Sequence, residues 1–371
     1  MGRRALCFLV VGMAAVAGCA RAGDGAEANE KPAETTGWPT IAFLLPETKT
    51  ARYETQDRPH FDANVRRLCP ECRLLYSNAN QEVATQSSQV DAALANGADV
   101  LVLDPVDSRA AAAMVRKARA AGVAVVSYDR LILDSPVDHY VSFDNIKVGE
   151  LQARTLIDRL RELGRATGTV VLIHGSPTDN NAGQYKRGAR QALERSALVL
   201  GAEYDTPDWS PDKAQRQMEQ AVTKLGPEAI AGVYAANDGT AGGAIAAMKA
   251  AGFTRLPPVT GQDAELEAVQ RILSGEQYMT VYKAIAKEAA AAAALAVALA
   301  RGQSPPAGLI NGDVPNGAGR VPSVLLEPVA VTVANLAATV FADGFWTPEQ
   351  VCTERLADAC RAAGIGSPGA S

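Results

Sequence analysis

From Thr40 onward, short apolar runs alternate with segments of helical periodicity, and this alternation is the strongest constraint on the fold. An apolar run of four to eight residues is typical of a buried strand. The segments between them, such as 83–97 and 108–122, have a helical pattern that stops at a glycine. Continuous apolar strands alternating with helices predict parallel sheets covered on both faces. The predicted strands span 41–46, 73–77, 99–105, 123–129, 169–175, 230–238, 257–263 and 278–282.

The length of 371 residues is ample for two domains, each with its own core. The formal net charge is −5 and no block of basic residues occurs, so the chain lacks the electrostatic pattern of a nucleic-acid-binding protein. The Ala-rich segment 286–302 is short for a membrane span and contains Lys287 and Glu288. We expect a surface helix packed on a core there.

The first residues predict export. MGRR supplies a positive start and ALCFLVVGMAAVAG an apolar stretch, as in a signal peptide. VAGC, residues 16–19, resembles a bacterial lipobox with Cys19 as the lipidated residue, although an ordinary small-residue cleavage site is the alternative. We therefore expect a lipoprotein signal peptide over 1–18 and a flexible, polar tether over 19–38.

The six cysteines sort by position. Cys7 lies in the signal and Cys19 at its end, which leaves two local pairs. A single CxxC motif in a chain with three His is a weak zinc pattern. In an exported protein, structural disulfides are the better interpretation. The expected pairs are Cys69 with Cys72 and Cys352 with Cys360.

Polar side chains follow most of the predicted strands where each strand ends. The stretch HGSPTDNNAGQY, residues 174–185, taken alone is ordinary turn chemistry. However, Asp, Asn, Arg or Lys recur after six strands, and ligands of open parallel sheets bind beyond the carboxyl ends of the strands. We therefore expect one shared cleft, with polar residues from 47–58, 129–130, 176–181, 237–238, 262–263 and Lys283.

The motifs for phosphate binding and catalysis are missing from the sequence. GxxxxGK[ST], HExxH and GxSxG do not occur, no predicted strand is followed by a GxGxxG fingerprint, and the three His lie at unrelated places. We predict no catalytic residue, no metal and no cofactor. Carboxylates, amides and guanidinium groups suit neutral polyols instead, because each sugar hydroxyl both donates and accepts. Tyr53 and Trp209 are candidates to cover the apolar faces of a sugar.

At these residues the chain resembles the xylose-binding protein family of periplasmic binding proteins. The resemblance covers about Ile41 to Phe345 and implies an α/β type I periplasmic binding protein fold. In that fold two Rossmann-like lobes with parallel sheets are joined by three hinge crossings, and a monosaccharide binds between them. The motifs occur in the expected order and are SYDRLI, VSFDN, KVGELQA, GSPTDNNA, AANDGTAGGAI, GQDAE and MTVYK.

Motif by motif, the resemblance implies nine sugar-binding residues. Tyr53 takes the place of a stacking Trp in the first loop, and Trp209 supplies the other stacking face. The first loop, ARYETQDR, departs from the family in length and in its aromatic residue, which bears on the identity of the sugar. The nine residues are Arg52, Tyr53, Arg130, Asp179, Asn181, Trp209, Asn237, Asp263 and Lys283.

The lobes are expected to be discontinuous in sequence. Residues 39–144 with 284–311 should form the N-terminal lobe, and 145–283 with 312–345 the C-terminal lobe. The hinge crossings are then expected near Asn145, Lys283 and Asn311. Residues 346–371 lie outside the matched pattern, and we expect a disulfide-closed tail there.

The resemblance implies the substrate-binding lipoprotein of an ABC sugar importer, with D-xylose as the best guess for the monosaccharide. The protein should be a monomer, exported and lipid-anchored to the cell membrane, facing outside or the periplasm. Its partners would be the permease and ATPase subunits. Two other classes stay open, a sensory binding protein that docks on a receptor and an exported sugar-modifying enzyme. A sugar-responsive regulator of the same fold would carry a helix-turn-helix where this chain has a signal and tether.

Overall fold

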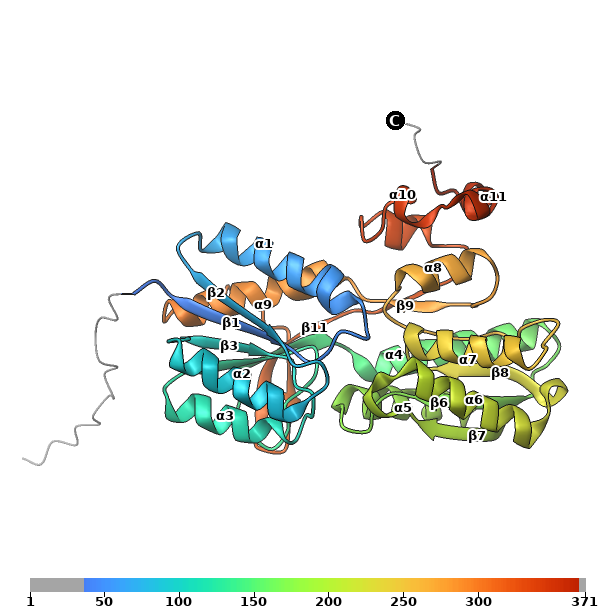
Figure 1. Cartoon of the computed structure of the whole chain (residues 1–371), viewed down its shortest axis with the longest axis horizontal. Helices are drawn as coiled ribbons and strands as arrows, with labels where there is room; N and C mark the ends of the chain where they lie inside the picture. Colours follow the sequence, from blue (N-terminus) through green and yellow to red (C-terminus); the bar gives the residue numbers. More distant parts are fainter. Residues whose placement is uncertain (1–36, 367–371) are drawn as a thin grey trace, which may run out of the picture. The chain divides into compact units, whose positions relative to one another are not determined.

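The computed structural model describes residues 37–366, so the expected signal peptide and nearly all of the tether lie outside the described residues. From Trp38 onward the chain builds two α/β lobes, called here the N-lobe and the C-lobe, and a C-terminal tail over 346–366 (Figure 1). Each lobe has a central sheet between helices, which confirms the α/β fold class expected from the alternating pattern.

The N-lobe contains a seven-stranded sheet of order β10-β11-β5-β4-β3-β1-β2. Its neighbouring strands are parallel except for the antiparallel pair β10 and β11. Strand order reverses around β1, which makes the carboxyl ends of β1 and β3 a switch point where ligands bind in open α/β sheets. The strands are β1 Thr40–Leu45, β2 Arg73–Asn78, β3 Val100–Leu103, β4 Ala124–Tyr128, β5 His139–Phe143, β10 Gly312–Pro315 and β11 Arg320–Leu326.

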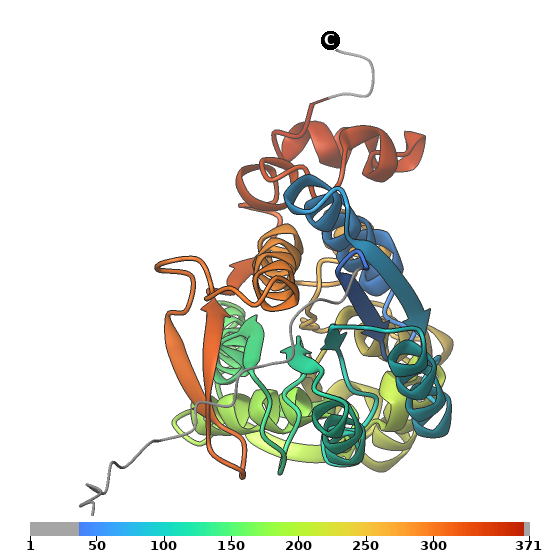
Figure 2. The ribbon, with the colours of Figure 1, turned by 90° about the vertical axis from the view of Figure 1, so that its left-hand side faces the viewer.

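Helices cover both faces of this sheet because its strands are apolar on both sides (Figure 2). Helices α2 (Val83–Ala95) and α3 (Ala111–Ala120) pack on one face. Helices α1 (Arg58–Leu68) and α9 (Ile285–Ala300) pack on the other, with the short π-helix η1 (Tyr53–Asp57) leading into α1. The Ala-rich segment is therefore a core-packed helix, as expected, and its small side chains allow a close approach to the strands.

The C-lobe has a smaller parallel sheet of order β7-β6-β8, which again reverses around its first strand. A separate antiparallel pair, β9 with β12, lies beside the chain at Gly261–Asp263 through bonds from Val281 and Asp263. The strands are β6 Thr169–His174, β7 Val199–Asp205, β8 Ile230–Ala235, β9 Thr280–Tyr282 and β12 Val329–Val331. The helices are α4 Asn145–Glu162, α5 Asn180–Leu193, α6 Pro211–Leu225, α7 Asp238–Ala250 and α8 Leu266–Leu273, with short η2 Pro207–Trp209 and η3 Pro227–Ala229.

Three connections join the lobes, and the third differs from expectation. The first is Asp144, between β5 and α4, and the second is Lys283–Ala284, between β9 and α9. The third is Glu327–Pro328, because β11 pairs in parallel with β5 of the N-lobe before the chain continues into β12. The assignment of 312–326 to the C-terminal lobe and of a hinge near Asn311 is therefore wrong.

The strand predictions failed in a few places, for identifiable reasons. Segment 257–263 is not a strand, since only Val259 bridges to Val233, and prolines at 257 and 258 lack the N–H that a ladder needs. Five strands had not been expected. Of these, β7 exposes Val199 and Leu200 and therefore lacks the pattern of a buried strand. The other four are β5, β10, β11 and β12.

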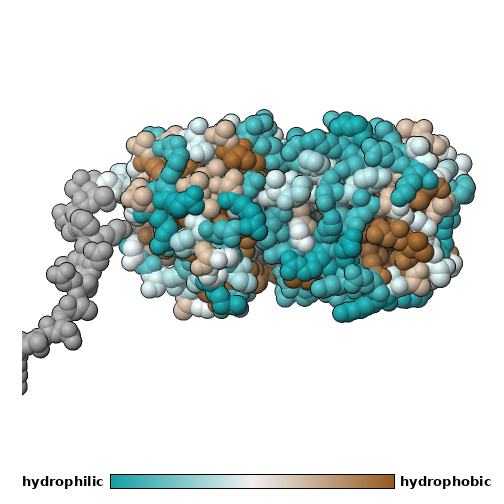
Figure 3. Space-filling model, turned by 90° about the horizontal axis from the view of Figure 1, so that it is seen from below, coloured by the Kyte–Doolittle hydropathy of each residue, from teal (hydrophilic) through white to brown (hydrophobic). Residues whose placement is uncertain are grey.

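Both expected disulfides are present, Cys69 with Cys72 and Cys352 with Cys360. The second of them closes the tail. After the π-helix η4 (Ala337–Phe341), the tail forms α10 (Pro348–Val351), η5 (Glu354–Leu356) and α11 (Ala357–Ala362), which lie over α8 (Figure 1). Among residues 37–366, no helix combines the length and the apolar character that a membrane crossing requires. Seen from below, much of the surface is polar, with a broad apolar area on the C-lobe at the right and smaller apolar areas on the N-lobe (Figure 3).

Candidate functional site

The polar residues that follow the strands meet between the lobes, where they line a cavity of about 20 Å³. All nine predicted residues line it, from Arg52 after β1 to Lys283 after β9. All except Asp263 lie in segments that follow the carboxyl end of a strand, as the strand-end argument requires, and Asp263 follows a segment that is not a strand. Two of the larger hollows, of about 310 and 420 Å³, share residues 255–258. The first includes Ile230 at the amino end of β8, the opposite edge of the sheet, so neither lies where such sheets bind ligands.

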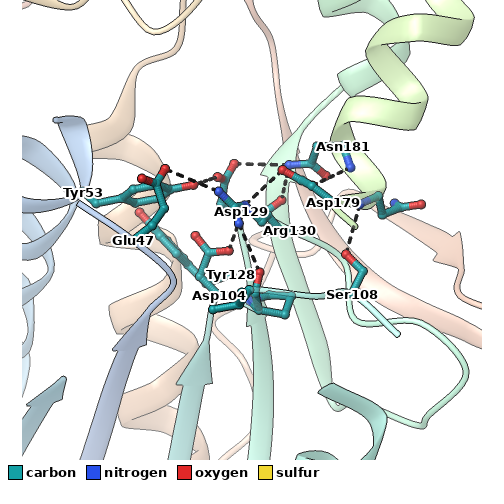
Figure 4. A network of polar contacts seen from close by, with 12 residues as sticks. Glu47, Tyr53, Asp104, Ser108, Tyr128, Asp129, Arg130, Asp179 and Asn181 are labelled. Carbon is teal, nitrogen blue, oxygen red and sulfur yellow. Dashed lines mark hydrogen bonds and ion pairs between the residues drawn. The ribbon is translucent and has the colours of Figure 1, made fainter. Parts of the chain in front are cut away.

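Arg130 forms the first centre of the site (Figure 4). Its guanidinium Nε lies 3.1 Å from Asp179 Oδ2 of the C-lobe and 3.6 Å from Asp104 Oδ1, and Nη2 lies 3.6 Å from Glu47 Oε1. Burial raises the pKa of Asp179, and Arg130 opposes that rise. Because Asp179 belongs to the C-lobe, this ion pair joins the two lobes across the cavity.

Arg52 forms the second centre and contacts carboxylates from four parts of the chain. Its Nε and Nη2 donate to the two oxygens of Asp57 at 2.9 and 2.8 Å, a bidentate arrangement. Nη2 also lies 3.3 Å from Glu288 Oε2 and 3.5 Å from Asp129 Oδ2, and Nη1 lies 3.5 Å from Asp263 Oδ1. The guanidinium is thereby held in one orientation, with its cavity side directed at Asp129 and Asp263.

Lys283 and Asp129 complete the charged ring. Lys283 Nζ lies 2.9 Å from Asp263 Oδ1 and 3.9 Å from Asp129 Oδ1. Burial raises the pKa of Asp129, but the attraction of Arg52, Lys283 and Arg130 outweighs it and lowers the pKa to about 2. The Asp129 carboxylate is therefore ionised at neutral pH and accepts a hydrogen bond from Tyr53 Oη at 2.9 Å.

Three aromatic side chains bound the cavity, Tyr53, Tyr185 and Trp209. The Tyr53 ring lies 5.0 Å from the Arg52 guanidinium carbon and 5.7 Å from that of Arg130. Trp209 donates from its indole N–H to Asp179 Oδ2 at 3.0 Å, and its ring lies against Gly175. A Cβ at Gly175 would come within 1.9 Å of the Trp209 ring, so only glycine fits at the end of β6.

Some amide groups of the site form hydrogen bonds within the protein, and two buried amide oxygens form none. Asn237 caps helix α7 by accepting from Thr240 N at 2.9 Å. Asn181 donates to the Asp129 carbonyl at 2.9 Å, again across the lobes. Among the described residues, Asn181 Oδ1 and Gln262 Oε1 are buried and accept no hydrogen bond from a protein group. A buried acceptor without a partner is costly, so these two atoms point to a ligand that carries donors.

The chain is similar to known proteins in both sequence and fold. Residues 41–304 match the family model of the periplasmic binding protein domain. The chain belongs to this family.

Among its relatives, this binding protein is 38% identical to the D-xylose-binding periplasmic protein of Escherichia coli, over 82% of its own length and 90% of that protein. It is 33% identical to the multiple sugar-binding periplasmic receptor of Rhizobium radiobacter, over 73% and 81%. The solved carbohydrate transporter solute binding protein from Chloroflexus aurantiacus, in complex with D-glucose, is 30% identical with a TM-score of 0.75 and covers 84% of this chain and 97% of that one.

The sequence missed several residues of the binding protein's site. Asp129 was noted at its strand end without a role, although it contacts both lobes. Tyr185 lines the cavity one helical turn after Asn181, a spacing that could have indicated it. Glu288 had been noted only as a charge within the Ala-rich segment, and it is a buried partner of Arg52. Four further residues lie in segments expected at the cleft but have no assigned role, Thr50 and Gln262 in the lining and Glu47 and Asp57 behind it. Asp104, also behind the lining, lies in a predicted strand.

Proposed function

We propose that this chain is the sugar-binding subunit of an ABC importer and binds one neutral monosaccharide, D-xylose as the best guess, between its lobes. One observation carries the proposal. The cavity lining holds three cationic and three carboxylate side chains, whose formal charges cancel, together with amides and three aromatic rings. A neutral polyhydroxylated ring uses every one of these groups, because its hydroxyls donate and accept and its C–H faces contact aromatic rings.

Binding would work through closure of the lobes. Arg52, Asp129 and Arg130 belong to the N-lobe, whereas Asp179, Asn181 and Asp263 belong to the C-lobe, so a sugar that bonds both sets favours the closed arrangement. The connections at Asp144, Lys283–Ala284 and Glu327–Pro328 are short segments between elements and would take up the change in backbone angles. The importer would then recognise the closed form.

The relatives support the choice of sugar class. Two relatives at 38% identity are named D-xylose-binding periplasmic proteins, and two solved neighbours with TM-scores of 0.76 and 0.75 contain D-glucose. A thermal-shift panel with D-xylose, D-glucose and myo-inositol, on protein beginning at Ala20, tests this directly. A sugar at 100 times its Kd should stabilise the protein by about 2.7 kcal/mol. If none of a broad set of pentoses and hexoses raises the Tm, the proposal fails.

Asp263→Ala tests the placement of the site. Asp263 is paired with Lys283 in a buried cavity, so its loss removes an acceptor from the sugar and leaves the ammonium only the carboxylate of Asp129, at 3.9 Å. We expect a loss of about 1–3 kcal/mol or more, which is ten- to a hundredfold or greater in Kd by isothermal titration. Asp358→Ala, at an almost fully exposed position in the tail, is the control and should bind as wild type. Wild-type affinity in a folded Asp263→Ala variant would place the sugar elsewhere.

The lipid anchor is a separate part of the proposal. Cys19 lies outside the described residues, and the sequence pattern VAGC supports its modification. Replacing Cys19 by Ser should release the protein from the membrane fraction of its producing cell. Finding the wild-type protein entirely in the soluble fraction would contradict this assignment.

A sensory role is the second candidate, because the relative from Rhizobium radiobacter is named a receptor. Reconstitution with the cognate permease and ATPase separates the two roles. Stimulation of ATP hydrolysis by the sugar-loaded protein supports transport, and capture of a membrane receptor without such stimulation supports sensing.

A further inference from the structure

The C-terminal tail contacts the segment that presents Asp263 to the cavity. The tail packs its apolar side chains against those of α8, and Cys352–Cys360 closes it. Trp346 lies at its start, with its ring edge-on to that of Phe345 at 5.5 Å between centroids. Its indole N–H donates to the carbonyl of Ala264 at 2.7 Å. Ala264 directly follows Asp263, so the tail reaches within one residue of the cavity lining.

The backbone at this point is in an unfavourable conformation. Asp263 has φ 95° and Ala264 has φ 50°, both in the left-handed region that side chains with a Cβ avoid. Such residues persist only where the surroundings hold them, and they cluster at functional sites. Glycine would adopt these angles without strain, yet the first of the two positions carries the carboxylate that faces the cavity.

Three hydrogen bonds hold the two strained residues. Asp263 N donates to Val281 O at 2.9 Å, and Ala264 N donates to Thr280 Oγ1 at 3.2 Å. These two come from β9. The third is the bond from Trp346 of the tail to the Ala264 carbonyl. Ala264 is fully buried, so loss of the indole donor would leave its carbonyl without this partner and free the peptide plane to rotate.

We propose that Trp346 is a positioning residue for the binding site and that the tail's function is to hold Asp263 in its binding orientation. This inference rests on the proposed function, because it takes Asp263 as a sugar ligand. The Asp263 carboxylate must satisfy Lys283 at 2.9 Å and Arg52 at 3.5 Å as well as the sugar. A small rotation at Ala264 therefore moves a group with several partners, and affinity falls although Trp346 touches no sugar.

The experiment is a double-mutant cycle measured by isothermal titration with D-xylose, or with whichever sugar stabilises the wild-type protein best. Trp346→Phe keeps an aromatic ring and removes the N–H. It should weaken binding about three- to tenfold, as expected for one lost hydrogen bond. Trp38→Phe is the matched control, because Trp38 is 71% exposed and distant in sequence from the tail, and it should bind as wild type.

The decisive arm is the Asp263→Asn background. If Trp346 acts through Asp263, then Trp346→Phe should change Kd less than about twofold there, since coupled residues do not act additively. An equal loss in both backgrounds would mean that the tail supports the C-lobe generally, and would overturn the inference. So would an unchanged Kd for Trp346→Phe in the wild-type background.

A second variant covers the case in which Trp346→Phe does not fold. Protein carrying 3-benzothienylalanine at position 346 keeps the bicyclic ring and lacks only the donor, and the same expectations apply to it. Failure of the proposed function has a different signature. In that case the wild-type protein binds no sugar, or Asp263→Asn binds as tightly as wild type whatever residue occupies position 346.

Discussion

Replacing Arg52 by Met should destabilise the N-lobe, because it leaves buried carboxylates without their cation. The side chains of Asp57 and Glu288 are both 0% exposed, and Arg52 is the guanidinium that each of them contacts. Met has a similar length and fills much of the same volume, so the main loss is electrostatic. Breaking a buried ion pair by removing one partner typically costs about 3–5 kcal/mol. We expect Arg52→Met to lower the free energy of unfolding at pH 8 by that amount.

The pH dependence of this loss tests its cause. Burial raises the pKa of Glu288, repulsion by Asp129 raises it further, and Arg52 opposes both effects. Without Arg52 the pKa of Glu288 rises more, so the folded variant binds a proton at a pH where the unfolded chain, with a Glu pKa of about 4.3, does not. Where the folded state binds more protons, stability rises as pH falls. The difference between Arg52→Met and wild type should therefore be smaller at pH 5 than at pH 8.

Urea unfolding followed by circular dichroism at both pH values is the assay. Arg361→Met removes the exposed pair with Asp358 and is the control, with an expected change below about 1 kcal/mol at either pH. Adding Glu288→Gln to Arg52→Met should recover part of the stability, because it removes one unpaired charge. A loss below about 1 kcal/mol at pH 8, or a loss that does not depend on pH, would refute the assignment of Arg52 as the cation that holds these carboxylates.

Three further experiments each test one feature of the structure: the Asp129 carboxylate, the contact between α4 and α5, and the two disulfides. Asp129→Asn should lower the free energy of unfolding at pH 7 by about 2 kcal/mol. The ionised Asp129 of the wild-type protein stabilises the fold above its unfolded pKa of about 3.9. In acid unfolding experiments the difference between the variant and wild type should therefore vanish as the pH falls from about 4 to about 2. Gly149→Ala should separate α4 from α5 and lower the Tm measurably, because the new Cβ would lie 2.0 Å from Tyr185 O. Thiol labelling of denatured, unreduced protein should leave Cys69, Cys72, Cys352 and Cys360 unlabelled. Labelling of any of these four cysteines would contradict the two disulfides.

The positions of the site residues were predictable because of a local rule. A parallel strand that ends in a polar residue places that residue at one edge of the sheet, so Arg130, Asp179 and Asn237 could be found without knowing their neighbours. The supporting layer had no such signal. Glu288 is the fourth residue of an Ala-rich helix. Nothing in the sequence around it indicates contact with Arg52, which is 236 residues away.

The predicted lobe boundary was wrong for the same reason, because it depends on a contact between segments that are far apart in the sequence. Strand β11 joins the N-lobe because its backbone pairs with β5, and this pairing depends on a partner 183 residues earlier. The hydrophobic pattern and β-propensity of a segment can indicate a strand, but they do not indicate which sheet edge that strand will pair with. Any exposed sheet edge offers the same backbone hydrogen-bonding groups. The residues of the third hinge crossing therefore could not be read from their own neighbourhood.

Sequence alone determined the alternation of strands and helices, the two local disulfides and the set of polar side chains at the strand ends, because each depends on residues close together in the chain. Tertiary structure alone decided which lobe receives β10 and β11, which acids surround Arg52 and Arg130, and that Trp346 of the tail meets the carbonyl next to Asp263. These contacts join distant segments, and their energies depend on burial. A carboxylate or an indole N–H acquires its role only when packing removes it from water and leaves it one partner.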